Sequence, residues 1–591
     1  MVGSLALSAL CAAIPLIVMF VMLGVFRTSA PVSALTGLAL SILLAILVWQ
    51  MPLGQALSST AAGAVYGFFP ILWILINALW VYKLTVATAW FEVLGRTIRS
   101  ISNDLRILAV LIGFCFGALL EGLAGFGAPV AITAAMLLAA GMKPIKSAMV
   151  ALLANTAPVA FGAMGAPIIA LQGVTGLELS DLSAMVGRQT PLIALIVPLV
   201  LVLLVDGRRG VRQTWPVAIV AGVAFAVSQF LISNYVTVEL TDVVAALATV
   251  LVVLLFLRVW QPREVIGIET DGATPADAAA AGSPGDAMPA GATSAAAGGS
   301  DPAASGPGGA TSEPEPGVTA GSVTAAVSAA GAEGAQLPQK TGRPSGREIW
   351  LSVAPYLVIM AVFSVAQLPG IKDWLLRSGG VSFRWPGVDV YTADGEPLAA
   401  QNFRIDHIRA TGSLLLVSGL ITLGIYRISL WTGIKVYGDT LKQLRWTLLT
   451  VSSVLALAFV MNFSGMTTSL GVALAATGGF FAVLSPVIGW IGVALTGSDT
   501  SSNSLFGQLQ VTAAAETGLS PVLMAASNSA AGVMGKMLSL QNLAVGAAAV
   551  SLEKGESTLF RRLLGWSVAL LAVITVLIVL QSTPVLSWMV P

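Results

Sequence analysis

Charged residues are scarce in this chain of 591 residues. Only 10% of the residues are charged and 56% are hydrophobic, whereas a typical soluble protein carries about 25% charged residues. A soluble protein of this size must place many polar residues on its surface, so the composition excludes a water-soluble enzyme. The apolar residues form long runs and not short alternating stretches, which also argues against a β-barrel. The composition therefore predicts an all-α polytopic membrane protein.

The residue types that bind metals and haem are also rare. The chain has two cysteines, Cys11 and Cys115, both in apolar runs, and one histidine, His407. Zinc and haem sites draw most of their ligands from these residue types, so we expect no cofactor and no metal site. The sequence lacks GxSxG, HExxH and CxxC motifs, which argues against an enzyme. The 29 basic and 28 acidic residues give a net charge of +1, so nucleic acid is not an expected partner.

Windows of about 20 residues locate the membrane spans. No Lys or Arg precedes Arg27. The first apolar run therefore lacks the basic start of a cleaved signal peptide, and residues 5–24 are expected to be a retained span. Spans are predicted near residues 5–24, 32–50, 61–83, 189–206, 215–235, 241–259, 349–367, 410–428, 446–464 and 563–581.

A polar segment divides the chain into two membrane halves, residues 1–260 and 348–591. The intervening residues 261–347 are mostly Ala, Gly, Pro, Ser and Thr. Such a segment cannot bury enough apolar surface to offset its chain entropy, so this linker is predicted to be disordered. Basic residues flank it, which predicts a cytoplasmic linker with both termini outside. A second polar stretch, 368–408, is expected to form a small ordered loop outside the bilayer.

Two apolar regions, 105–170 and 468–548, are interrupted by Gly, Pro, Ser, Thr and Asn. They share an order of landmarks, which suggests an internal repeat. Secondary transporters often have two similar halves with discontinuous helices at matching positions. We therefore predict about 12–14 membrane segments in two repeat-related halves with broken or re-entrant helices. The paired landmarks are Glu121 and Asp499, Phe126-Gly127 and Phe506-Gly507, Thr133 and Thr512, Pro144 and Pro521, and Asn155-Thr156 and Asn528-Ser529.

These two broken-helix regions are the predicted transport site. The N-termini of half-helices offer N–H groups and a positive dipole to an anion, although small residues would also serve close helix packing. An unpaired carboxylate in an apolar run is costly, so Glu121 is expected to be protonated part of the time, paired or facing water. Glu121, ahead of Asp499, is the predicted proton-coupling residue, although Asp499 could equally cap a helix. The predicted substrate-binding residues are Asn155, Thr156, Ser501, Asn503, Asn528, Ser529 and Lys536, and the predicted helix-break glycines are Gly125, Gly127 and Gly507.

Two of these residue types allow a second interpretation. Lys536 could neutralise a substrate carboxylate, or its long side chain could reach the membrane interface. The asparagines could hold a substrate, or they could join neighbouring helices by hydrogen bonds. His407 lies beside Asp406 and Arg409 and is interpreted as a residue of the membrane interface.

Four stretches resemble the lactate permease family of bacterial carboxylate transporters. They are EGLAGFGAPVAI (121–132), NTAPVAFGAMGAP (155–167), GSDTSSNSLFGQLQ (497–510) and SNSAAGVMGKMLSLQN (527–542). The resemblance covers nearly the whole chain outside the linker. It implies a multi-pass protein of the bacterial cytoplasmic (inner) membrane that takes up L-lactate, with D-lactate and glycolate as further substrates, together with protons. It is also similar to a wider group of transporters built from inverted repeats with re-entrant hairpins, which suggests an elevator-like mechanism.

The leading hypothesis is thus a proton-coupled symporter for small 2-hydroxymonocarboxylates. Its expected partners are this substrate class, protons and the lipid bilayer. Two alternatives stay open. An anion channel requires a continuous polar pore, but it does not require an acid beside a broken helix. A Na⁺-coupled carrier would move the same monocarboxylates with a different ion.

Overall fold

The fold is described from a computed structural model that covers residues 4–88, 90, 92–93, 97, 101–123, 125, 127–266, 345–391, 401–552 and 555–591. Most of the predicted linker at 261–347 and one landmark residue, Phe126, lie outside these residues. The described chain is helical apart from one antiparallel hairpin, in which Val381 of β1 is opposite Ile405 of β2. The prediction of an all-α membrane protein is therefore confirmed.

The elements follow one another in two groups. The first group is α1 (Leu5–Gly24), α2 (Ala30–Leu47), α3 (Leu53–Tyr66), the π-helical η1 (Gly67–Leu72), α4 (Trp73–Val86), α6 (Leu105–Leu108), the π-helical η2 (Ala109–Phe116), α7 (Gly117–Leu123), α8 (Ala128–Ala139), α9 (Pro144–Ala154), η3 (Val159–Phe161), α10 (Gly162–Thr175), α11 (Leu179–Tyr235) and α12 (Thr241–Val259). The second group is α14 (Gly346–Ala366), α15 (Pro369–Ser378), β1 (Val381–Arg384), β2 (Asn402–Ile405), α16 (Thr411–Tyr426), α17 (Leu430–Ser464), α18 (Met466–Ala475), η5 (Gly478–Phe480), α19 (Phe481–Thr496), α20 (Asp499–Thr517), α21 (Pro521–Lys536), α22 (Leu540–Ala549), α23 (Glu556–Gln581) and η6 (Ser587–Met589).

Ten described helices are long and apolar enough to cross a membrane, or eleven if α9 and the η3–α10 segment, bent by 61°, count as one span. The sequence prediction of 12–14 membrane segments is higher than this count, because it includes α16 and counts α11 as two spans. The 57-residue α11 is interrupted at Asp206 and Gly207, whose backbone angles leave the helical region. Its two arms lie antiparallel, because Ser183 Oγ donates to the Ser233 carbonyl at 2.9 Å. The relation of the two halves by a repeat stays a prediction.

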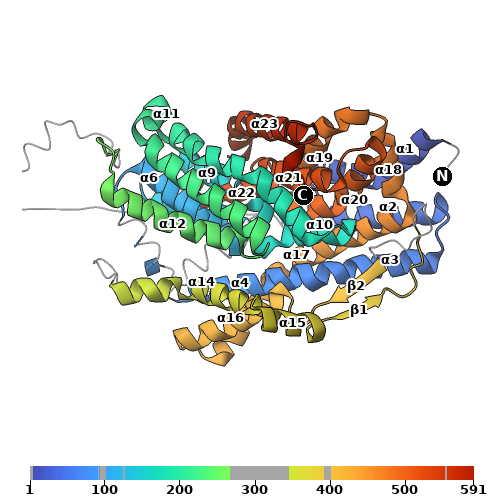
Figure 1. The fold of residues 1–591 in the computed structure, drawn as a ribbon, viewed down its shortest axis with the longest axis horizontal. Coiled ribbons are helices and arrows are strands. Elements are labelled where there is room, and N and C mark those ends of the chain that lie inside the picture. Colours follow the sequence, from blue (N-terminus) through green and yellow to red (C-terminus); the bar gives the residue numbers. More distant parts are fainter. Residues whose placement is uncertain are drawn as a thin grey trace, which may run out of the picture.

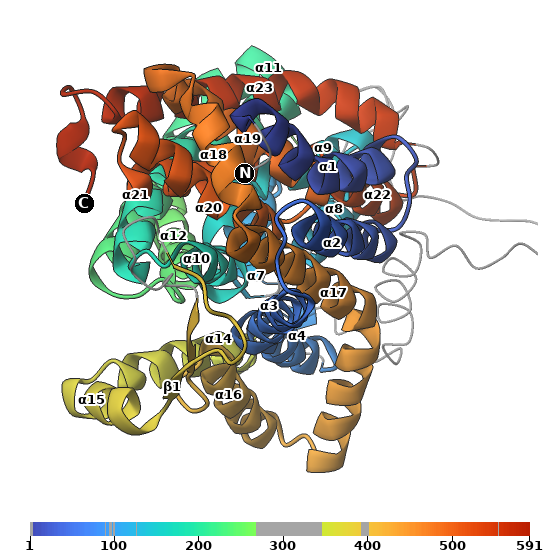
Figure 2. The same ribbon diagram turned by 90° about the vertical axis from the view of Figure 1, so that its right-hand side faces the viewer.

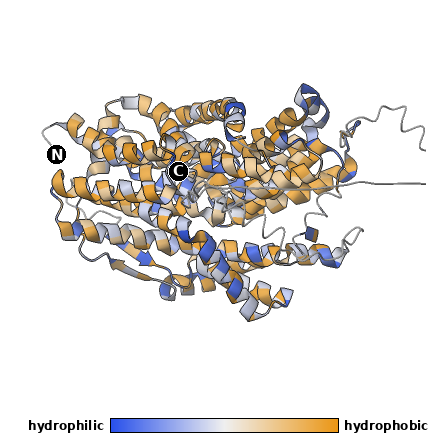
Figure 3. Cartoon of the chain, turned by 180° about the vertical axis from the view of Figure 1, so that it is seen from behind, coloured by the Kyte–Doolittle hydropathy of each residue, from blue (hydrophilic) through white to orange (hydrophobic). Residues whose placement is uncertain are grey.

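The outer and central helices differ greatly in how much of their length is buried inside the protein. In the most apolar 18-residue stretch of each helix, 33% is buried in α1 and 28% in α2, against 94% within residues 105–123. Figure 3 shows hydrophobic colour along most of the helices. Large exposed side chains such as Leu10 and Leu47 would be costly in water and are suited to contact with lipid. The polar residues of the central helices must instead find partners inside the protein.

In Figure 1, helices α11 and α12 reach one end of the long axis, the N-terminus and α1 lie at the other end, and the β1–β2 hairpin lies beside α3. In both ribbon views α14, α15 and α16 lie along one side of the molecule, where α16 packs against α4 (Figures 1 and 2). Helix α11 turns next to its basic residues Arg208, Arg209 and Arg212, and Arg209 pairs with Glu264 at 2.6 Å. The basic turn and the described residues 261–266 thus lie side by side at one end of the molecule. That this end faces the cytoplasm stays a prediction.

Candidate transport site

Two interruptions of the helices bring backbone and polar side chains into the centre of the first half. Between α7 and α8, Gly125 and Gly127 have φ angles of 54° and 86°, which glycine adopts at little cost. The second interruption lies within the first turn of α10, where Ala163, Met164 and Gly165 have φ angles of 45°, 56° and 77°. A residue other than glycine in this region costs about 1–3 kcal/mol and persists only when its surroundings hold it.

Gly507 requires a correction, because it does not break a helix. It lies inside the continuous helix α20. A β-carbon at this position would lie 2.6 Å from Leu171 Cδ1 of α10. Gly507 therefore permits close packing of α20 on α10, and the sequence pattern could not separate this role from that of a helix break.

A buried ion pair joins the two predicted regions. Glu121 of α7 and Lys536 at the end of α21 are 415 positions apart, and Lys536 Nζ lies 2.5 Å from Glu121 Oε1. Their side chains are only 3% and 7% exposed. The positive charge at the C-terminus of α21 is also favourable toward the helix dipole. Lys536 therefore lies inside the protein and does not reach to the membrane interface.

The second oxygen of Glu121 is held by the first half itself. Asn155, which follows the last residue of α9, donates from Nδ2 to Glu121 Oε2 at 2.9 Å. Gly162 leaves room for the carboxylate, since a β-carbon there would lie 2.9 Å from Glu121 Oε1. Both oxygens of Glu121 thus have a donor, and one of these donors is a cation.

Asp499 has a different environment at the start of α20. Ser529 of α21 donates to Asp499 Oδ2 at 2.6 Å, and Asn503 donates to the same oxygen at 3.4 Å. Oδ1 has no hydrogen-bond partner among the described residues, although Asp499 is buried. Lys536 lies on the same helix as Ser529, but the described residues show no ion pair between Lys536 and Asp499. Ser498, and not Asp499, caps the helix by accepting from the backbone N–H of Ser501.

A chain of amides connects the Asp499 cluster to the first half. Asn503 donates to the carbonyl of Pro167 in α10 at 3.1 Å, and Asn528 donates to Asn503 Oδ1 at 2.9 Å. Gln510 donates to Asn528 Oδ1 at 3.1 Å. All of these amides are buried. The two interrupted regions therefore form one continuous polar centre with Glu121, Lys536 and Asp499.

Glycines let α21 pack closely against α19 and the start of α20, which places the polar side chains of α21 in this centre. A β-carbon at Gly532 would lie 2.8 Å from Asp499 Oδ1 and 2.7 Å from the Val493 side chain of α19. Gly489 of α19 and Gly535 of α21 face the partner helix's backbone at Asn528 and Trp490 in the same way. Small residues in this stretch thus serve both packing and the site, so the two interpretations of the sequence pattern are compatible.

The remaining predicted residues form fewer hydrogen bonds within the polar centre. Thr156 is buried beside Asn155, and its Oγ1 has no partner in the described part of the chain. Ser501 is buried in the first turn of α20. His407 is exposed in the turn after β2 and stands apart from the polar centre.

The sequence interpretation missed Gln510, Gln229 and Asp242. Asp242 begins an apolar run, so it resembles an ordinary acidic residue at a helix N-terminus.

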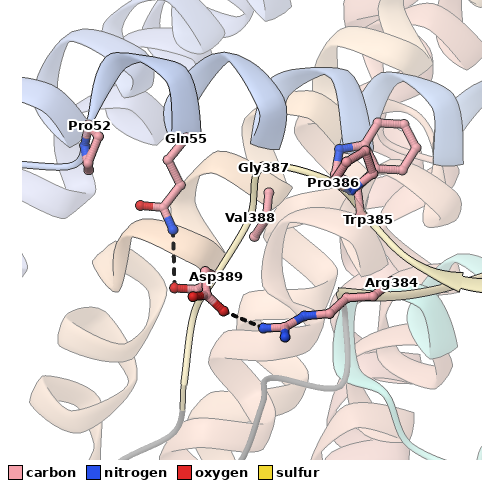
Figure 4. A pocket seen from close by; sticks show the side chains of 8 residues that line it. All are labelled: Pro52, Gln55, Arg384, Trp385, Pro386, Gly387, Val388 and Asp389. Atoms are coloured by element: carbon pink, nitrogen blue, oxygen red, sulfur yellow. Dashed lines mark hydrogen bonds and ion pairs between the residues drawn. The ribbon is translucent and has the colours of Figure 1, made fainter.

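A hollow of about 640 Å³ lies elsewhere, between the start of α3 and the segment after β1 (Figure 4). Arg384 and Asp389 form an ion pair across it, and Gln55 donates to the Asp389 carbonyl at 3.3 Å. This hollow is lined mainly by residues that follow β1, and neither Glu121 nor Asp499 lines it. In the described ranges, no three His, Cys, Asp or Glu residues cluster in a way that could hold a metal ion.

The chemistry of the polar centre is that of a cation held by an acid. The described residues of this centre include a lysine, Lys536, that could bind a carboxylate and two acids, Glu121 and Asp499, that could take up a proton. They also provide neutral donors and acceptors around both. Such a set could bind a small hydroxy acid and a proton.

Comparison with known proteins adds an independent finding. A family profile described as L-lactate permease matches residues 8–289 and 324–585. The chain is 39% identical over 592 residues to the glycolate permease GlcA of Escherichia coli (strain K12), covering 98% of this chain and 96% of that protein. It is 38% identical over 608 residues to the L-lactate permease of Bacillus subtilis (strain 168), covering 100% and 98%. It is 37% identical over 601 residues to the L-lactate permease of Escherichia coli (strain K12), again covering 100% and 98%.

Among solved structures, the YdaH transporter of Alcanivorax borkumensis aligns with 88% of this chain and 86% of its own. The sequence identity is 13% and the TM-score is 0.39. This likeness is too low to establish a shared fold.

Proposed function

Since the chain belongs to the L-lactate permease family, we propose that it takes up L-lactate, and also D-lactate and glycolate, by symport with protons. It is a multi-pass transporter of the bacterial inner membrane and not an enzyme. The observation that carries the proposal is the buried pair of Glu121 and Lys536.

Lys536 is the proposed anchor for the substrate carboxylate. In the structure its ammonium group is occupied by Glu121, so a substrate anion must compete with an internal anion for one cation. If the substrate takes Lys536, Glu121 loses its counter-charge inside the protein. Breaking a buried pair in this way costs about 3–5 kcal/mol, because an uncompensated charge remains.

Protonation of Glu121 removes that cost. A neutral carboxylic acid needs no cation, and Asn155 can still hydrogen-bond to it. Lactate and the proton therefore bind in support of each other, which is the thermodynamic requirement for symport. In this scheme Glu121 is the proton-coupling residue and the pair is the coupling device.

The exchange also keeps the charge of the site constant. The empty site holds Lys536 with ionised Glu121, and the loaded site holds Lys536 with lactate and a neutral Glu121. Moving one elementary charge against the membrane potential costs about 2.3 kcal/mol per 100 mV. A loaded carrier with unchanged charge avoids this cost, so the pH gradient drives the net uptake.

Neutral groups around the pair would recognise the rest of the substrate. Thr156 Oγ1 is buried beside Asn155 with no partner among the described residues, which suits a hydrogen bond to the 2-hydroxyl group. Ser501, Asn503, Asn528 and Ser529 would complete the other wall around Asp499. Asp499 is a second candidate for proton coupling.

The test is uptake of radiolabelled lactate into proteoliposomes, with pH and Na⁺ gradients imposed separately. An alkaline interior should drive accumulation above the external concentration, and a Na⁺ gradient at equal pH should not. Accumulation driven only by the Na⁺ gradient would show that Na⁺, and not the proton, is the coupling ion. Equilibration without accumulation under either gradient would support an anion channel instead.

A further inference from the structure

Asp242 is a second buried acid of the first half, and the scheme above does not use it. It lies in the first turn of α12 and is only 1% exposed. Gln229 of α11 donates to its Oδ1 at 3.0 Å. Its Oδ2 has no hydrogen-bond partner among the described residues, and no described cation forms an ion pair with it. A carboxylate in this setting is poorly compensated as an anion and is better accommodated with a proton.

The location of Asp242 connects it to Glu121. A β-carbon at Gly122, the residue after Glu121, would lie 3.3 Å from Asp242 Cβ. The start of α12 therefore packs directly on the backbone of α7 beside Glu121. Ionisation of one of two neighbouring acids disfavours ionisation of the other.

The other elements packed against α12 leave Glu121 as the main charged neighbour. These elements are α7, α10, α11 and η2. Helix α10 has no ionisable side chain, and η2 has only the thiol of Cys115. Helix α11 meets Asp242 through Gln229, while its Arg188 donates to Asn234 and the Met589 carbonyl.

A third carboxylate lies on the way to the surface. Glu239 precedes α12 by two residues and is partly exposed. It accepts hydrogen bonds from Thr237 and, at 3.3 Å, from Thr411 at the start of α16. Because α16 directly follows the β1–β2 hairpin, Glu239 lies on the hairpin side of the protein. Glu239 is thus a partly exposed acid three residues before Asp242, and Asp242 packs on the helix that carries Glu121.

We propose that Asp242 relays the coupling proton between Glu121 and the hairpin side of the protein. When lactate takes Lys536, the O–H bond of Asp242 breaks and a new O–H bond forms on Glu121. Asp242 then takes a proton from water on the hairpin side by way of Glu239. The inference rests on the proposed proton symport.

The test compares Asp242→Asn with wild type in two transport modes. A relay sets how fast the proton arrives and not how many protons are coupled. Proton transfer by a positioned side chain is worth about 10²–10⁴-fold, so the initial rate of pH-driven uptake should fall at least about tenfold. The final accumulation ratio should stay unchanged, and so should lactate exchange at equal pH, because exchange can proceed with Glu121 protonated throughout. Asp242→Glu should restore much of the rate.

Asp181→Asn is the matched control, since Asp181 also lies in the first turn of a membrane helix, α11, outside this network. Equal losses in uptake and exchange, or a normal uptake rate in Asp242→Asn, would overturn the relay. Should Asp242→Asn fail to fold, infrared spectroscopy replaces the transport assay. The carbonyl band of a protonated carboxylic acid is then compared between wild type and Asp242→Glu. A band that shifts between them supports the relay, and its absence contradicts it. Wild type without pH-driven accumulation would instead overturn the proposed symport itself.

Discussion

Glu121 and Asp499 are paired landmarks of the predicted sequence repeat, yet their surroundings in the structure differ. Glu121 has a lysine on one oxygen and an asparagine on the other. Asp499 has neutral donors on one oxygen and none on the other. Two acids that the sequence pattern pairs therefore differ in the structure. One contacts a cation, and the other contacts only neutral hydrogen-bond donors among the described residues.

The largest effect is expected from breaking the ion pair at its cation. Lys536→Met should abolish lactate binding and destabilise the protein by about 3–5 kcal/mol, because Glu121 is left buried without its partner. Glu121→Gln combined with Lys536→Met should recover the stability without recovering the binding. Thermal unfolding and lactate binding of the purified proteins measure both. Lactate binding by either variant would show that Lys536 is not the anchor.

The next comparison sets the two acids against each other. Glu121→Gln mimics the protonated acid, so it should lose pH-driven accumulation while lactate exchange stays measurable. Asp499→Asn should weaken both activities together, because Asp499 holds Ser529 and Asn503 in place. Uptake and exchange assays in the same proteoliposomes separate the two patterns. The opposite result would make Asp499 the proton-coupling residue.

A smaller effect is expected at the two asparagines. Asn155→Ala removes a hydrogen bond that is stronger to the ionised Glu121 of the empty site than to the neutral acid of the loaded site, so it should lower the half-saturating lactate concentration about 5- to 10-fold. Asn528 bonds to the neutral Asn503 and Gln510, so Asn528→Ala should instead raise it about 2- to 10-fold. Concentration series of initial uptake rates give both values. Normal values in both variants would mean that these side chains only join helices.

The smallest effect is expected from the linker. Deleting residues 270–338 should leave transport per folded molecule nearly unchanged, since the low-complexity composition offers no substrate-binding chemistry. The family profile also skips residues 290–323 within it. A tenfold loss of uptake with normal membrane insertion would reveal a role for this segment.

The sequence predicted the membrane class, most spans and the polar residues of the site, because these depend on local composition. It could not predict which acid Lys536 meets, since that contact joins positions 415 residues apart. Local patterns also misplaced one break. Gly507 matched Gly127 in the sequence but lies within a helix, while Ala163 and Met164 take left-handed angles imposed by their surroundings. Asp242 was missed because its burial, with no partner for Oδ2 among the described residues, is a property of packing alone.

The central claim is that lactate and Glu121 compete for Lys536, so that lactate binding takes up a proton. Calorimetric titration of the purified protein with lactate, repeated in buffers of different ionisation enthalpy, counts that proton directly. Wild type should take up about one proton per lactate at a pH where Glu121 is ionised in its pair, and Glu121→Gln should take up none. Lactate binding to wild type without proton uptake, or with the same uptake in Glu121→Gln, would contradict the account.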